Sequence, residues 1–179
     1  MAAPEAVVER RRAGSAARAW LITFAATAAS TYALDAVATA AGVALAASGL
    51  LHGLDHGLVL AFLAGSYVLW AAGLRVSLAA NWSLLEDTGT STNALSKAAY
   101  DLTKLRSTSA RMTKVAAAAG YVGTELAKEA PYYAGAFGTA LVSDSVSSND
   151  ALVFLAGANL GAAVYEYGVA WLTRAFLRR

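Results

Sequence analysis

The sequence contains no cysteine, only two prolines and only two histidines among its 179 residues. The absence of cysteine excludes disulfide bonds and thiol chemistry. Charged residues are also scarce, at 15% of the chain, whereas 58% of the residues are hydrophobic. A soluble domain of this size needs far more polar surface. The composition therefore indicates a membrane protein, and the abundance of alanine beside so little proline favours closely packed helices over strands.

Four long apolar runs, each ending at a polar segment, make up most of the chain. They are residues 19–51 and 58–85, joined by a turn at 52–57, and residues 115–142 and 151–177, joined by a turn at 143–150. About 20 apolar residues in a helix cross the roughly 30 Å hydrocarbon core of a bilayer. We therefore predict an all-α fold, a polytopic membrane protein with four transmembrane helices arranged as two hairpins in a bundle. The first run, roughly 50 Å long as a straight helix, must tilt, break or project from the membrane.

The runs divide the chain into four segments. These are a basic N-terminal segment (1–18), a first transmembrane hairpin (19–85), a polar connector (86–114) and a second transmembrane hairpin (115–179). Apolar residues recur every three or four positions after residue 94 of the connector, which predicts an amphipathic helix with Ser91 or Thr92 as its cap. Pro131 should kink the third apolar helix or start it anew, because proline lacks a backbone donor.

The distribution of basic residues predicts the orientation. Lysine and arginine occur before the first run, in the connector and at the C-terminus, whereas both hairpin turns lack them. Cytoplasmic loops of membrane proteins carry an excess of lysine and arginine. Both termini and the connector should therefore be cytoplasmic, both turns should face outward, and the expected location is the cell (plasma) membrane.

Six ionisable residues interrupt the apolar runs, and they form a belt at similar depth in the cytoplasmic third of the predicted bundle: Asp35, Arg75, Glu125, Lys128, Glu129 and Glu166. By helical rise, Asp35 and Arg75 lie roughly 25 and 27 Å from the first turn, close enough in depth to pair. In the functional interpretation, the belt lines a path for an ion or small solute, with Asp35 and Glu166 as proton or cation sites. In the alternative, these groups are interfacial, and they extend to the cytoplasm or pair across helices to fix the register.

The tyrosines of the second hairpin gather near the belt. Tyr132, Tyr133, Tyr165 and Tyr167 have hydroxyls that can donate to its carboxylates. The commoner role of such residues, which we favour, is interfacial anchoring or packing.

The first turn holds both histidines of the chain. His52, Asp55 and His56 provide two imidazoles and a carboxylate within one turn, a set suited to Zn²⁺, and Asp144 or Asp150 of the second turn offers a fourth ligand. The alternative is a polar loop whose histidines bond to helix ends, which the flanking Gly53 and Gly57 favour, since they indicate a turn and not a preorganised helix face.

No catalytic motif or phosphate-binding glycine loop is present, so an enzyme is not expected, and no cofactor is indicated. The net charge of +2 is too small to indicate nucleic-acid binding. Small-residue faces around Gly42 and around Gly157 and Gly161 predict helix contacts between subunits of a homo-oligomer in the bilayer. The first functional hypothesis is an oligomeric channel or transporter, and the second is a scaffold or accessory subunit of a larger membrane complex.

Overall fold

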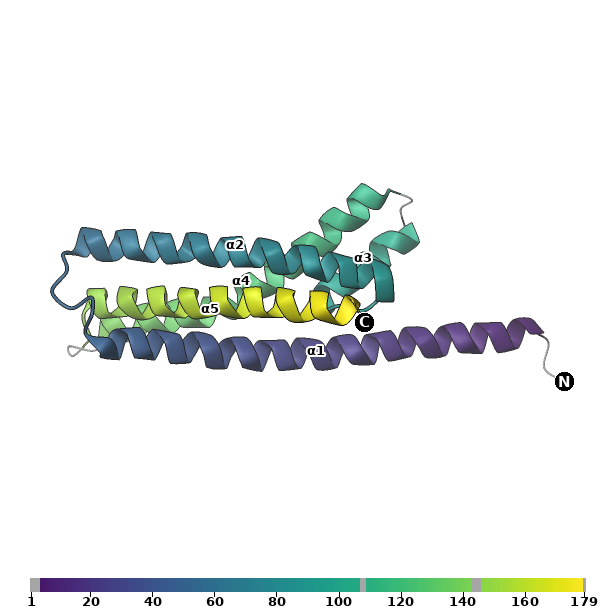
Figure 1. The fold of residues 1–179 in the computed structure, drawn as a ribbon, viewed down its shortest axis with the longest axis horizontal. Helices are drawn as coiled ribbons and strands as arrows, with labels where there is room; N and C mark the ends of the chain where they lie inside the picture. Colours follow the sequence, from purple (N-terminus) through teal and green to yellow (C-terminus); the bar gives the residue numbers. More distant parts are fainter. Residues whose placement is uncertain (1–3, 107–108, 143–145, 179) are drawn as a thin grey trace.

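A computed structural model describes residues 4–106, 109–142 and 146–178, with side chains from residue 13 onward. Every regular element in these ranges is an α-helix, which confirms the all-α prediction. The helices are α1 (Pro4–Ser48), α2 (His56–Thr88), α3 (Ala94–Arg106), α4 (Ala110–Val142) and α5 (Ser148–Leu177). Figure 1 shows α1, α2 and α5 running roughly along one direction, with α4 slanting across them and α3 at one end of the bundle.

Helix α5 is the centre of the bundle. It lies between α1 and α2 (Figure 1), and these two helices make their main contacts with α5 and not with each other. Most of its buried residues are small or apolar, as in the stretch from Leu155 to Ala158. Each of α1 and α2, the arms of the first predicted hairpin, thus packs mainly on a helix of the second. A nearly continuous series of small residues lets α5 accept neighbours on several faces.

Glycine makes the contact between α1 and α5 close. A Cβ added at Gly157 would lie 2.7 Å from the carbonyl oxygen of Ala41, and one at Gly161 would lie 2.7 Å from that of Val37. On α1, a Cβ at Gly42 would lie 2.7 Å from the ring of Phe154. These are the small-residue faces expected between subunits. The structure uses them inside one chain, where they let two backbones approach.

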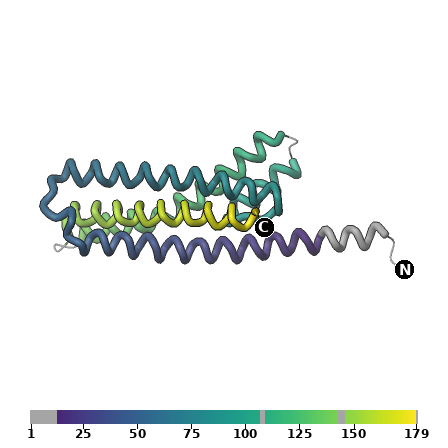
Figure 2. Tube along the Cα trace, viewed as in Figure 1, coloured from purple at the N-terminus to yellow at the C-terminus, as the bar shows by residue number. Residues whose placement is uncertain are grey.

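The two interhelical turns meet at one end of the bundle. The Nδ1 atom of His56 lies 2.6 Å from Oδ1 of Asn149, and Nε2 of His52 lies 3.7 Å from a carboxylate oxygen of Asp150. The end of α5 and helix α3 lie at the opposite end, toward which the N-terminal half of α1 also runs (Figure 1), and the trace in Figure 2 follows the same path. The arrangement matches the predicted grouping of turns against termini and connector.

Three helices are long and apolar enough to cross a membrane: residues 13–48 of α1, all of α2 and all of α5. Among the described residues α4 does not join them, because Glu125, Lys128 and Glu129 interrupt its apolar sequence. Helix α4 continues through Pro131, so no new helix starts there. The chain is thus compatible with a membrane protein.

The connector forms the predicted helix α3, but its cap is neither Ser91 nor Thr92. The Oδ1 atom of Asn93 accepts the backbone N–H of Ser96 at 2.9 Å, so the asparagine side chain caps the helix. Helix α3 packs on α4, where a Cβ at Gly120 would lie 2.8 Å from the carbonyl oxygen of Leu95. The connector helix is therefore docked on the bundle.

Candidate functional site

Glu166 is fully buried where α5 faces α2 and α4. One carboxylate oxygen, Oε2, accepts hydrogen bonds from the Ser77 hydroxyl of α2 and, at 3.4 Å, from the Tyr121 hydroxyl of α4. Tyr121 also donates to Ser77 at 3.0 Å, so the three side chains form one cluster. The other oxygen, Oε1, is buried without a hydrogen-bond partner among the described residues. A carboxylate is left half-satisfied at the centre of the bundle.

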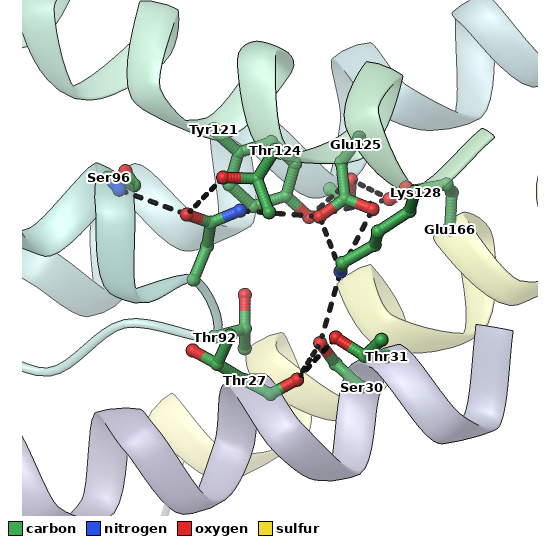
Figure 3. Close-up of polar contacts among 12 residues, drawn as sticks. Thr27, Ser30, Thr31, Thr92, Ser96, Tyr121, Thr124, Glu125, Lys128 and Glu166 are labelled. Carbon is green, nitrogen blue, oxygen red and sulfur yellow. Dashed lines mark hydrogen bonds and ion pairs between the residues drawn. The ribbon is translucent and has the colours of Figure 1, made fainter. Parts of the chain in front are cut away.

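Glu125 and Lys128 form a buried ion pair on one face of α4. The Nζ atom of Lys128 lies 2.9 and 3.1 Å from the two carboxylate oxygens, and only 7% and 4% of the Lys128 and Glu125 side chains are exposed. Asn93 donates to the same carboxylate at 3.3 Å, and Lys128 also donates to the Ser30 hydroxyl of α1 at 3.4 Å. Figure 3 shows how this pair bridges α4 to α1 and to the start of α3.

Glu129 is the least satisfied of the buried carboxylates. It lies one turn after Glu125 on α4, and only 4% of its surface is exposed. Both of its carboxylate oxygens are buried, and neither has a hydrogen-bond partner within the described part of the chain. Burying an uncompensated carboxylate as an anion is costly, and a proton or a cation would offset that cost.

These four residues, Glu125, Lys128, Glu129 and Glu166, are called the acidic core below. The core sets three buried carboxylates against one ammonium group, and Lys128 is already bound to Glu125. When all four groups are ionised, the core is negative and offers three unpartnered oxygens. Such a centre attracts protons and cations and repels anions.

Asp35 and Arg75 do not belong to the acidic core, and they do not pair. Asp35 on α1 is half-buried and accepts the Tyr132 hydroxyl at 3.0 Å. Arg75 on α2 is exposed and lines a different cavity, together with Lys114. The predicted Asp35–Arg75 pair is therefore wrong, and the predicted belt is divided. The reason is that α5 separates α1 from α2, so equal depth does not bring the two side chains together.

Tyrosine hydroxyls do reach the belt, although we favoured anchoring or packing for them. Tyr132 donates to Asp35, as above, and Tyr133 donates to the side-chain oxygen of Asn159 on α5 at 3.2 Å. The main donor to Glu166 besides Ser77 is Tyr121, which the sequence did not single out. The sequence indicated that tyrosine hydroxyls can donate to these carboxylates, but it did not identify Tyr121 as the tyrosine that donates to Glu166.

A second polar cluster, which sequence analysis missed, fixes the loop between α2 and α3. Asn81 of α2 accepts the Ser91 hydroxyl at 2.6 Å and the Thr92 backbone N–H at 3.0 Å, and it donates to the Ser96 hydroxyl at 3.1 Å. The Ser91 backbone N–H donates in turn to the Thr23 hydroxyl of α1 at 3.1 Å. We call Asn81, Ser91, Thr92 and Ser96 the loop clamp. Its only sequence signal was a polar Asn within an apolar run.

The turn residues proposed as metal ligands are held in other contacts. His56 faces Asn149, His52 faces Asp150, and Asp55 caps α2 by accepting the Leu58 backbone N–H at 3.0 Å. Within residues 4–106, 109–142 and 146–178, no three His, Asp or Glu side chains gather in a way that could hold a metal ion. Asp144, proposed as a further ligand, lies outside the described residues. The arrangement supports the polar-loop interpretation.

The chain was compared with known families, curated proteins and solved structures. No family, no curated protein and no solved structure matches it.

Proposed function

We propose that the protein is an integral membrane protein of four spanning helices, α1, α2, α4 and α5, and that it is a channel or transporter for a cation or small cationic solute. In this proposal both termini and α3 lie on the cytoplasmic side. Helix α4 crosses the membrane with its charged face turned toward α1 and α5. The acidic core is the place where the cation is held on its way through the bundle.

The observation that supports this function is that both buried carboxylate oxygens of Glu129, and the buried Oε1 of Glu166, have no partner among the described residues. A purely structural network would satisfy its members, because a buried polar group without a partner is expensive. Insertion data put the cost of a charged residue at the middle of a membrane helix at roughly 2.5 to 3.5 kcal/mol. The presence of Glu129 and Glu166 is understandable if a bound cation or proton occupies their unpartnered oxygens.

The negative charge of the acidic core determines which class of solute it can bind. One lysine stands among three carboxylates, and that lysine is occupied by Glu125. The hydrogen-bond donors Ser77 and Tyr121 reach only one oxygen of Glu166. The vacant positions are therefore acceptors, which bind protons, inorganic cations or ammonium groups.

Flux through liposomes tests the proposal. Purified protein is reconstituted, and uptake of protons, Na⁺ and K⁺ is followed with entrapped fluorescent indicators. We expect flux of at least one cation, and we expect Glu129→Gln and Glu166→Gln each to lower it about tenfold or more, since each removes a charge from the core. Glu86→Gln, at an exposed position on the same chain, is the matched control and should leave the flux unchanged.

The variants must also remain folded for the comparison to hold. Helical circular dichroism and elution in size-exclusion chromatography report this directly. Flux that is equal in wild type and both core variants, or absent for every cation offered to a folded protein, would contradict the proposal.

A second candidate function, a scaffold or accessory subunit, is favoured by the length of α1. Its 45 residues measure roughly 68 Å, more than a bilayer needs, and its N-terminal part extends beyond the other helices (Figure 1). Such an arm offers a docking surface for a partner. Native mass spectrometry after extraction in mild detergent separates the two functions, since a scaffold should retain a stoichiometric foreign subunit and a channel should not.

A further inference from the structure

A cavity of about 830 Å³ opens on the side of the bundle, between α2 and α4. The exposed residues Val68 and Leu126 lie at its rim, and the buried Asn159 of α5 lies at its base. We call this space the lateral cavity. Its volume falls within the range of roughly 300 to 1,000 Å³ that is usual for small-molecule sites.

The wall of the lateral cavity is apolar except for a few groups. Asn159 is already bonded, since it accepts from Tyr133 and donates to Ser66 at 3.4 Å. Glu129 is not, because neither of its oxygens has a partner in the described part of the chain, and the same holds for the buried indole N–H of Trp70. Both Glu129 oxygens are buried, so the cavity combines a largely apolar wall with one carboxylate that lies beneath it.

Aromatic rings face the same space. Tyr67 and Trp70 of α2 both line the cavity, and their ring centroids lie 5.1 Å apart. Tyr133 of α4 lines the opposite side, four residues after Glu129 and thus on the same helical face. Aromatic faces attract organic cations, most strongly where water is excluded.

We propose that the lateral cavity binds an organic cation with a large apolar body, such as a quaternary phosphonium or ammonium compound, and that Glu129 supplies its counter-charge. The apolar wall favours such a ligand over a hydrated metal ion, which gains nothing from leucine and valine side chains. The rim lies on a surface that faces acyl chains if α2 and α4 span the bilayer, so an amphiphile already dissolved in the membrane can enter from the side. This inference names a class of solute for the proposed function. It rests on that function only for the transport of the solute through the bundle, and not for its binding in the cavity.

Binding is tested on the purified full-length protein in detergent, without transport. Tetraphenylphosphonium is the probe, and tetraphenylborate, an anion of nearly the same shape, is its control. Isothermal titration calorimetry gives the dissociation constant of each. We expect saturable binding of the phosphonium, with no comparable binding of the borate.

Two pairs of variants locate the site. Glu129→Gln should raise the dissociation constant of the phosphonium about tenfold or more, because it removes the opposing charge, whereas Glu86→Gln should not. Ala64→Trp places a large ring at the cavity wall and should abolish binding, whereas Ala61→Trp, one turn away at an exposed position outside the cavity, should not. The tryptophan pair keeps the test valid if Glu129→Gln fails to fold.

The outcomes separate this inference from the transport proposal. Equal binding of phosphonium and borate, binding unaffected by both Glu129→Gln and Ala64→Trp, or no binding to the folded protein would overturn it. In the first case the cavity is an apolar surface for lipid or for a second copy of the chain. If an inorganic cation passes in a Glu166-dependent way and the phosphonium does not bind, the transport function stands and only the organic-cation site is ruled out. If the phosphonium binds at the lateral cavity and no cation passes, the binding site stands and the transport function is ruled out.

Discussion

Gly73 of α2 lies directly against Glu166 of α5. A Cβ at residue 73 would be 3.1 Å from the Cβ of Glu166 and 3.2 Å from the carbonyl oxygen of Ala163. The absence of a side chain at this position lets the two helices approach and brings Ser77, one turn further along α2, to the Glu166 carboxylate. The polar contact at the centre of the bundle thus depends on a small-residue contact beside it.

The first prediction is that Gly73→Ala destabilises the protein although alanine is the better helix former. The new methyl group must push α2 from α5, and overpacking of a close contact costs about 1 to 3 kcal/mol. Thermal unfolding in detergent, followed by circular dichroism, measures the change. Gly65→Ala is the matched control in the same helix, because nothing lies within 4 Å of a Cβ there, and it should stabilise by about 0.5 to 1 kcal/mol through helix propensity. Equal shifts for the two variants would argue against close packing at Gly73.

The second prediction concerns the loop clamp. Asn81→Ala removes the side-chain acceptor of the half-buried Thr92 backbone N–H, whereas the Ser91 hydroxyl keeps the Asn93 carbonyl oxygen as an acceptor at 2.9 Å. Leaving a donor unsatisfied in the interior costs about 1 to 3 kcal/mol. We expect a clear loss of stability and faster hydrogen exchange of the Thr92 amide. Ser83→Ala is the control on the same helix, since its exposed hydroxyl bonds only to the carbonyl of Ala79. Unchanged protection of Thr92 in Asn81→Ala would show that the loop is held by other contacts.

The helices could be predicted from sequence because their cause is local. The lengths of the apolar runs and the positions of the polar turns predicted how many helices the described chain contains. They also predicted most helix ends to within a few residues. The cap of α3 was misplaced because Ser91, Thr92 and Asn93 are all good capping residues. The choice of Asn93 follows from the loop clamp, in which Asn81 bonds to Ser91 and Thr92, ten and eleven positions further along the chain.

The arrangement of the helices could not be predicted, because it depends on which apolar faces meet. The two predicted hairpins left open which helices meet, and in the structure the Gly157 and Gly161 face of α5 packs closely on α1. That one choice explains why Asp35 and Arg75, equal in depth, stay apart. Glu125, Lys128 and Glu129 do share one face of α4, since residues three or four apart on one helix lie on the same face in any packing.

The third prediction is the topology, and the fourth span is its critical part. The chain has no cysteine, so single substitutions of exposed leucines give unique thiols: Leu50→Cys between α1 and α2, Leu105→Cys near the end of α3 and Leu141→Cys near the end of α4. A membrane-impermeant maleimide applied to intact cells should label residues 50 and 141, and it should label residue 105 only after permeabilisation. The physical basis is the excess of lysine and arginine at the α3 end.

Leu141 decides whether α4 crosses the membrane. Among the described residues three helices are apolar enough to span, and α4 is not one of them, yet Glu125 and Glu129 expose only 3% and 4% of their surface, so neither lies on the open surface of α4. If α4 spans, residue 141 lies on the same side as residue 50, as it does in the bundle. Labelling of residue 141 together with residue 105 would mean that α4 does not cross, and the acidic core would then have no continuous path through the membrane.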